Sequence, residues 1–204
     1  MARPQTISDD QILEAARRCL LELGPQATME AIAGGLGVSP QALIKRFGSK
    51  QQLVVAALCI TDEPAWRKLV EAGPDDRPAA DQLREILQAL AGFFVDVVRR
   101  MSVLRWSGVQ PEELLKQFEE PPPLVDVRVL AGWFRRAYQR GLIREIDDEA
   151  TAMLALTSLH GPAMITEMLG RRPTRHSQPE YVDYLVDVLL TGLSPGQNAT
   201  SGMA

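Results

Sequence analysis

Apolar residues recur every three or four positions along most of this chain, which is the spacing that gives an amphipathic helix one buried face. No segment shows the strict alternation of apolar and polar residues that predicts a half-buried β-strand. Gly and Pro separate the periodic segments, as is typical of helix ends. The pattern predicts an all-α fold of about nine helices, at residues 8–23, 28–36, 40–47, 49–63, 79–106, 107–120, 124–140, 147–169 and 178–193.

Three of these helix starts carry a capping box, in which two side chains satisfy free backbone amides reciprocally. The pairs are Ser8 with Gln11, Ser49 with Gln52, and Ser177 with Glu180.

One loop divides the chain. Residues 72–80 are Ala-Gly-Pro-Asp-Asp-Arg-Pro-Ala-Ala, and such clusters are typical of loops. The length of 204 residues fits one large or two small domains. We therefore expect an N-terminal domain at 1–58, a second helical domain at 79–194 and a flexible polar tail at 195–204.

Residues 28–53 predict a helix, a tight turn and a second short helix, which is the layout of a helix-turn-helix. Thr28 and Ser39 can cap the two helices, and Gly37 suits a left-handed turn between them. In such a motif the second helix enters the major groove of DNA. The expected core that sets the angle between the helices is Ile32, Leu36, Val38, Leu43 and Phe47.

Three short patterns make this segment similar to the TetR family of bacterial transcriptional regulators. They are Ile12-Leu13-Glu14-Ala15-Ala16, Thr28-x-x-x-Ile32-Ala33-x-x-Leu36-Gly37-Val38-Ser39 and Leu43-x-x-x-Phe47-x-Ser49-Lys50-x-x-Leu53. The resemblance covers about residues 8–58, and the rest of the chain agrees with the family only in length and helical character. It implies an N-terminal three-helix DNA-binding domain, followed by a helical domain for ligand binding and dimerisation.

Two features of the helix-turn-helix depart from the family's pattern. Family members commonly carry a tyrosine, whose hydroxyl bonds a phosphate, at the position of Ile44; here Lys45 or Arg46 is left to supply such a contact. Gly34 and Gly35 each cost a helix about 1 kcal/mol relative to Ala. They indicate either close backbone approach or simple tolerance, and both interpretations stay open.

The resemblance implies a set of DNA-contacting residues. Thr28 and Lys50 lie at helix starts, where free amides attract phosphate, while Gln41 can pair with adenine and Lys45 or Arg46 with guanine. Solvated surface charge is the alternative for each basic residue. The predicted DNA-binding residues are Thr28, Ser39, Gln41, Ala42, Lys45, Arg46 and Lys50, with Arg3 in a flexible arm as a further contact.

One such module buries too little surface for specific binding. We therefore expect a homodimer that presents two recognition helices to a partially palindromic operator. The resemblance implies that the helices at 148–169 and 178–193 pack against those of a partner; core packing within one chain is the alternative for any single residue. Candidate interface residues are Leu154, Leu156, Leu159, Ile165, Tyr181, Leu185, Val188 and Leu189.

The second domain is expected to hold a small hydrophobic or aromatic effector, whose binding favours a state that releases DNA. Ordinary core packing is the alternative for each candidate residue. His160, beside Gly161 and Pro162, is either a polar group that orients a ligand or a core histidine with satisfied hydrogen bonds. The candidates are Phe94, Met101, Trp106, Trp133, Phe134, His160 and Met164.

Composition and charge indicate which kinds of binding site and which cellular location the sequence favours. The net charge of −4 and the pI of about 5.3 permit DNA binding without indicating it. Cys19 and Cys59 fall in apolar helical patterns and are interpreted as small buried side chains. Neither they nor the two histidines show metal-ligand spacing, so we predict no metal and no cofactor. Without an apolar run of about 18 residues or a signal peptide, we expect a cytoplasmic protein with no membrane segment.

Two other functions compete with that of a ligand-responsive, DNA-binding repressor. An enzyme is disfavoured because the sequence has no nucleophile elbow, phosphate loop, zinc-protease motif or clear pair of carboxylates. A helical adaptor with a degenerate helix-turn-helix would bind a protein partner and lack salt-sensitive DNA binding. An activator would use the same fold as the repressor.

Overall fold

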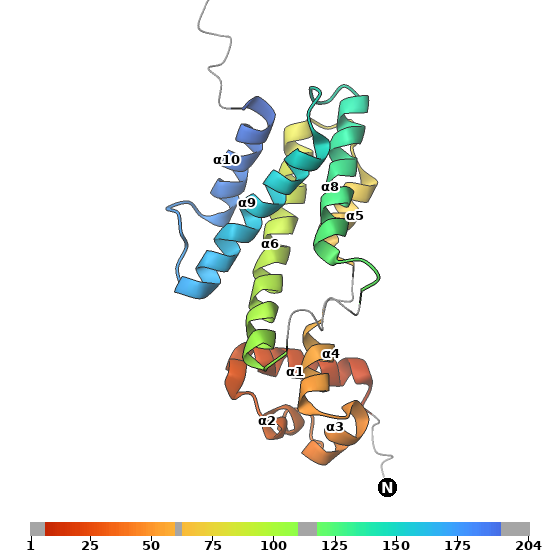
Figure 1. The fold of residues 1–204 in the computed structure, drawn as a ribbon, viewed down its shortest axis with the longest axis vertical. Coiled ribbons are helices and arrows are strands. Elements are labelled where there is room, and N and C mark those ends of the chain that lie inside the picture. Colours follow the sequence, from red (N-terminus) through yellow and green to blue (C-terminus); the bar gives the residue numbers. More distant parts are fainter. Residues whose placement is uncertain (1–6, 60–62, 110–117, 193–204) are drawn as a thin grey trace, which may run out of the picture. The chain divides into compact units, whose positions relative to one another are not determined.

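The computed structural model describes residues 7–59, 63–109 and 118–192. Within these ranges the chain forms nine α-helices, one short 3-10 turn and no strand, so the predicted all-α fold is confirmed (Figure 1). The helices are α1 (Asp9–Leu23), α2 (Met29–Gly34), α3 (Pro40–Phe47), α4 (Lys50–Leu58), α5 (Ala65–Ala72), α6 (Ala79–Trp106), α8 (Pro122–Gln139), α9 (Asp148–Leu169) and α10 (Gln178–Thr191).

The observed helices differ from the predicted set in two places. α5 is absent from that set, although Pro64 at its N-cap and its buried Trp66 and Val70 are signals of a short amphipathic helix. The predicted helix at 107–120 falls largely on residues 110–117, which lie outside the described ranges. Nine helices are therefore described, close to the predicted number, but α5 is one of them and the predicted helix at 107–120 is not.

Two of the predicted capping boxes are complete. Ser8 Oγ accepts from the Gln11 amide at 3.2 Å, and Gln11 Oε1 accepts from the Ser8 amide at 2.9 Å. Ser177 and Glu180 repeat this arrangement at the start of α10. At the start of α4 the structure shows the serine half of the box, in which Ser49 Oγ accepts from the Gln52 amide at 3.1 Å.

The chain divides into two compact units. Unit 1 runs to residue 61 and includes 97–120, while unit 2 contains 62–96 and the residues from 121 onward. α6 therefore contributes its first part to unit 2 and its last part to unit 1. The functional division predicted at 1–58 and 79–194 stays a prediction, and the predicted tail at 195–204 lies outside the described residues.

In unit 1 the helix-turn-helix packs against α1, α4 and the last part of α6. Arg17 Nε on α1 donates to the Ala57 carbonyl of α4 at 2.9 Å, and Arg99 Nη2 on α6 donates to the Leu21 carbonyl at 2.8 Å. These bonds hold three helices together around one apolar core. Its buried side chains are Ile12, Ala16, Leu20, Ala27, Met29, Ile32, Ala33, Leu43, Leu53, Val54, Ala57, Leu58, Val103, Leu104 and Val109.

Unit 2 packs α8 against α5 and α9, and α10 against α9. Its largest buried side chains are aromatic: Trp66, Trp133 and Phe134 are each at most 1% exposed. Burying side chains of this size supplies about 1.5–3 kcal/mol each before cavity effects. This core gives the elements around it defined positions.

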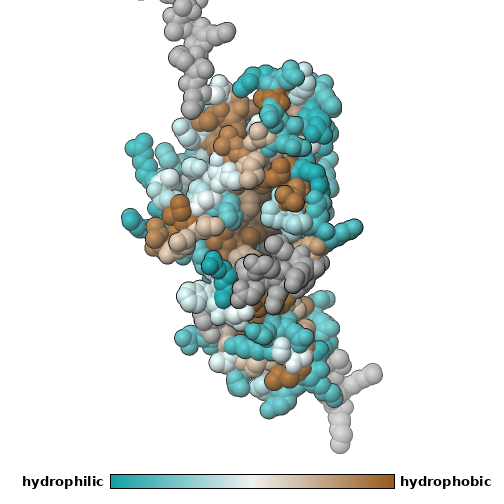
Figure 2. Space-filling model, viewed as in Figure 1, coloured by the Kyte–Doolittle hydropathy of each residue, from teal (hydrophilic) through white to brown (hydrophobic). Residues whose placement is uncertain are grey.

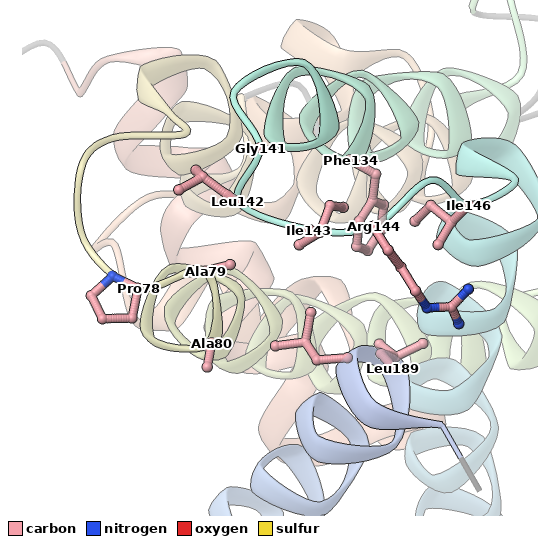
Figure 3. A pocket seen from close by; sticks show the side chains of 11 residues that line it. Pro78, Ala79, Ala80, Phe134, Gly141, Leu142, Ile143, Arg144, Ile146 and Leu189 are labelled. Carbon is pink, nitrogen blue, oxygen red and sulfur yellow. The ribbon is translucent and has the colours of Figure 1, made fainter. Parts of the chain in front are cut away.

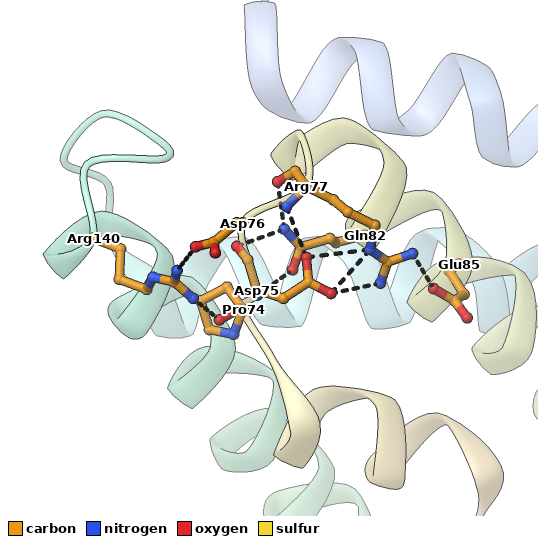
Figure 4. A network of polar contacts seen from close by, with 7 residues as sticks. All are labelled: Pro74, Asp75, Asp76, Arg77, Gln82, Glu85 and Arg140. Atoms are coloured by element: carbon orange, nitrogen blue, oxygen red, sulfur yellow. Dashed lines mark hydrogen bonds and ion pairs between the residues drawn. The ribbon is translucent and has the colours of Figure 1, made fainter.

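A polar network fixes the loop between α5 and α6 (Figure 4). Gln82 is only 3% exposed, accepts from the Asp75 amide at 2.8 Å and donates to the Arg77 carbonyl at 2.6 Å. Arg140, the C-cap of α8, donates to the Pro74 carbonyl and to Asp76. The loop is thereby tied to both α6 and α8.

Membrane-spanning and metal-binding features are both absent from the described ranges. None of the helices there is long and apolar enough to cross a bilayer. No three or more His, Cys, Asp or Glu side chains gather there as metal ligands would.

Candidate nucleic-acid interface and effector region

The turn between α2 and α3 is built by short-range hydrogen bonds. Thr28 Oγ1 accepts from the Ala31 amide at 3.1 Å, and Ser39 Oγ accepts from the Ala42 amide at 3.2 Å. Gly37 has φ +66°, a conformation that costs other residues about 1–2 kcal/mol. Pro40 opens α3 without losing a needed hydrogen bond. The predicted helix-turn-helix geometry is therefore present in the chain.

The outer face of α3 carries a mixture of polar and apolar side chains. Gln41, Ile44 and Lys45 are exposed, and their spacing of three and four residues puts them on one side of the helix. Leu43, 1% exposed, anchors the opposite side in the core of unit 1. Ile44 is 45% exposed and is missing from the predicted site residues. The sequence signal that could have identified Ile44 is its place, as an apolar residue, on the same helix face as the polar Gln41 and Lys45.

Arg46 has partners within the protein that the sequence did not predict. Its Nη1 donates to the Ile7 carbonyl at 2.6 Å, and its guanidinium forms an ion pair with Asp9. Both contacts join the last turn of α3 to the start of α1. The guanidinium of Arg46 is therefore engaged by residues of unit 1.

The remaining predicted DNA-binding residues are exposed at the surface of unit 1. Among the described residues, neither Lys45 nor Lys50 forms an ion pair, so both charges are available to a phosphate. The hydroxyls of Thr28 and Ser39 are occupied as helix caps, and Ala42 is exposed in the first turn of α3.

On α1, burial and the charge of Glu22 raise the pKa of the Cys19 thiol, which favours the packing interpretation of that cysteine.

Two aromatic pairs bring together four of the predicted effector residues within unit 2. Phe94 meets His160 edge to face with ring centroids 5.3 Å apart. Trp133 meets Phe134 in the same manner at 5.5 Å. Phe94 is 8% exposed and the second pair is wholly buried, so core packing already accounts for much of their contact surface.

The other three predicted effector residues lie apart from these pairs. Met101 and Trp106 belong to the portion of α6 in unit 1, where Met101 packs against the core and Trp106 is 74% exposed. Met164 is 43% exposed on α9. The structure therefore does not collect all seven candidates in one cavity of the described residues.

α9 presents an apolar stripe, defined by Leu154, Gly161, Met164 and Met168. These positions are seven, three and four residues apart, which fits the seven-residue repeat of a helix seam with Thr157 at the position between Leu154 and Gly161. The three large side chains are 53%, 43% and 73% exposed. Ile165 and Leu169 extend the exposed apolar surface at the end of α9. A brown patch lies at the left edge of Figure 2, where Figure 1, in the same view, places the end of α9. Of the predicted interface residues, Leu156, Leu159 and Leu185 are instead buried in the core of unit 2.

The fold and this interface define an all-helical protein with an N-terminal helix-turn-helix. Residues 12–57 match the family model described as bacterial regulatory proteins, tetR family. The chain is similar in structure to the TetR-family transcriptional regulator PfmR from Thermus thermophilus. The match covers 91% of this chain and 100% of PfmR, with 26% identity and a TM-score of 0.59. Residues 12–57 therefore match the DNA-binding domain of the TetR family, as the sequence motifs predict, and the chain as a whole is similar to TetR-family transcriptional regulators.

Two further solved structures share the fold at lower identity. A TetR-family regulator from Mesorhizobium loti matches 89% of this chain and 94% of its own, at 20% identity and a TM-score of 0.68. FadR from Bacillus subtilis, in complex with stearoyl-CoA, matches 92% of this chain and 100% of its own, at 15% identity and a TM-score of 0.59. No curated protein sequence matches the chain. Regulators of this family are generally non-enzymatic.

Proposed function

We propose that the chain is a homodimeric, effector-responsive repressor that binds a partially palindromic operator through α3. The observation that carries the proposal is the outer face of α3, where Gln41, Ile44 and Lys45 are exposed over the buried Leu43. Glutamine and lysine side chains pair with adenine and guanine edges, and an apolar group contacts the thymine methyl. A short helix that is anchored on one side and carries this mixture on the other suits base reading in the major groove.

The apolar stripe of α9 supports dimerisation. Soluble monomers rarely expose large contiguous apolar patches, and the stripe has the seam spacing of paired helices. A second copy related by a two-fold axis would bury the same residues on both partners. At Gly161, within the stripe, no neighbouring atom lies within 4 Å of the position that a Cβ would take. This space leaves room for a partner's side chain.

An effector response is supported by the composition of unit 2 and by one structural relative. The core of unit 2 is rich in aromatic side chains. Among them, the buried Phe94 contacts His160, which is partly exposed. The FadR relative holds stearoyl-CoA, a ligand with a long apolar chain, on the same fold. We propose that a small hydrophobic or aromatic molecule binds unit 2 and favours a conformation that releases DNA. It can do so only to the extent that it binds the two conformations with different affinity.

Selection from random duplex DNA tests the DNA-binding part. The full chain is incubated at low salt with random duplexes, and bound fragments are sequenced. We expect a partial palindrome with half-site centres one helical turn apart, about 10–10.5 base pairs, or a multiple of it. No enriched sequence, or enrichment of single half-sites only, would contradict the proposal. Transcription in vitro from a promoter that overlaps the recovered site then distinguishes repression, which is expected, from activation.

A further inference from the structure

Unit 2 contains a half-open apolar pocket, and Phe134 is the one predicted effector residue among those that line it (Figure 3). It lies between the first turn of α6, the loop that follows α8, and the end of α10. Its volume of about 610 Å³ falls in the range of small-molecule sites, roughly 300–1,000 Å³. The apolar wall is formed mainly by Phe134, Leu142, Ile143, Ile146 and Leu189.

Arg144 is the one ionisable residue among those that line the pocket. Within the described part of the chain it forms no hydrogen bond or ion pair. Figure 3 shows its side chain running beside Phe134 and ending on the side of the pocket where Ile146 lies. A guanidinium next to apolar surface and without a carboxylate partner is complementary to an anionic group attached to an apolar body.

The walls of this pocket are positioned independently of any ligand. The loop after α8 begins with a tight turn, in which the Gly141 amide donates to the Tyr138 carbonyl at 2.8 Å and the Leu142 amide to the Ala137 carbonyl at 2.9 Å. The loop that leads to Ala79 and Ala80 is fixed by the Gln82 network. A preformed site loses less conformational entropy on binding.

We propose that this pocket binds an amphipathic monocarboxylate, whose apolar body packs against the partly exposed Leu142, Ile143 and Leu189. Arg144 donates two parallel hydrogen bonds to the carboxylate, the geometry that the guanidinium fork favours. One guanidinium balances one negative charge, which favours a monoanion over a phosphate ester that carries two. The regulatory meaning of the site rests on the proposed effector response, whereas the binding itself does not.

Calorimetric titration of sodium decanoate into the full-length protein, below the micellar concentration, tests the inference. We expect saturable binding that Arg144→Gln weakens at least about tenfold, because hydrogen bonds to charged groups are the strong ones. Arg175→Gln is the matched control: it removes an exposed arginine outside the pocket and should leave the decanoate affinity unchanged. 1-Decanol, which lacks the charge, should bind more weakly and equally to both proteins, and acetate, which lacks the apolar body, should not bind.

Ala80→Phe provides a second variant, because Ala80 lines the pocket and a larger side chain there fills it. It should abolish decanoate binding while the helical circular dichroism stays that of the wild type. Unchanged decanoate affinity in either Arg144→Gln or Ala80→Phe would overturn the inference. Binding of the selected duplex is measured on the same preparations without decanoate, so that a failure of the proposed function is recognised separately from a failure of this site.

Discussion

Arg46 on α3 forms an ion pair with Asp9 in the first turn of α1. The Arg46 side chain is 38% exposed and that of Asp9 60%, so water screens the pair and it contributes little to the stability of the whole unit. Together with the hydrogen bond from Arg46 to the Ile7 carbonyl, however, it fixes the end of α3 to α1. We infer that Arg46 orients the recognition helix, whereas Lys45 contacts DNA.

The two neighbouring basic residues should therefore differ in their salt dependence. Lys45→Gln removes one positive charge from the DNA-facing side of each subunit. Because this charge is lost from the proposed DNA-binding face, the slope of log K against log salt should become shallower by up to about 1 per subunit. Arg46→Gln should weaken operator binding several-fold and leave this slope unchanged. Fluorescence anisotropy with the selected duplex between low and moderate salt measures both quantities.

Asp9→Asn is the control that separates orientation from direct contact. If Arg46 orients α3, Asp9→Asn weakens binding as Arg46→Gln does, and the double variant is no weaker than either single one. If Arg46 instead contacted a phosphate, removal of Asp9 would free it and strengthen binding. That second result would refute the assigned role.

Ile44→Ala should reduce specificity more than stability. Ile44 is 45% exposed, so its truncation creates no cavity and should change the free energy of unfolding by less than about 0.5 kcal/mol. Without an apolar group to meet a thymine methyl, operator affinity should fall several-fold. Affinity for unrelated duplex, measured in parallel, should not change; an equal decrease on both duplexes would argue against a base contact.

Two glycines in the helix-turn-helix should respond to alanine in opposite directions. Gly34 is the last residue of α2, and no neighbouring atom lies within 4 Å of the position that a Cβ would take there, so Gly34→Ala should stabilise the protein by up to about 0.5 kcal/mol. Gly37 has φ +66°, so Gly37→Ala should destabilise it by about 1–2 kcal/mol. Urea denaturation measures both. Destabilisation by Gly34→Ala would show that α2 needs the glycine for another reason.

Charged substitutions in the α9 stripe should disrupt dimerisation. Met164→Glu combined with Met168→Glu introduces two carboxylates into the proposed self-complementary surface, where like charges of two copies would repel. Sedimentation velocity should show a shift from dimer to monomer, with at least tenfold weaker operator binding. Tyr138→Glu, at a 45% exposed position on α8, is the matched control and should leave the mass unchanged. A double variant that stays dimeric would place the interface elsewhere.

Asp126 should make stability depend on pH in an unusual direction for a carboxylate. It lies on α8, 2.5 Å from Arg67 Nη2, and burial raises its pKa while the hydrogen bond and charge of Arg67 oppose the rise. A pKa that is higher in the folded than in the unfolded state means that the folded protein binds the proton more tightly. The free energy of unfolding should therefore fall as pH rises through the range just above the ordinary carboxyl pKa.

Asp126→Asn is the comparison for this pH dependence. Urea denaturation of both proteins at a series of pH values should show the wild type losing stability relative to Asp126→Asn across that range. A wild type that gains relative stability there would show that Arg67 outweighs burial.

Local sequence signals predicted much of the fold and of the helix-turn-helix. Capping serines, Gly37 and Pro40 act through neighbours one to five residues away, so their effect is legible without the tertiary structure. Gly34 illustrates an alternative that the sequence left open: the open space around it favours tolerance over close approach.

Contacts between distant parts of the chain could not be predicted in this way. The pairing of Arg46 with Ile7 and Asp9 joins residues nearly forty positions apart. The burial of Leu156 and Leu159 rather than Leu154 depends on which face of α9 meets α8. The pocket around Arg144 combines three separate segments, and no single one of them carries a recognisable signal.

Dimethyl sulfate protection of the selected duplex tests the central claim most directly, because this reagent methylates guanine N7 in the major groove. If α3 enters the major groove from each of two paired subunits, wild-type protein should protect guanines in two clusters whose centres lie one or more helical turns apart. Lys45→Gln should remove protection at the same guanine of both clusters. Protection of one cluster only, or bound protein that leaves every guanine N7 reactive, would contradict the account.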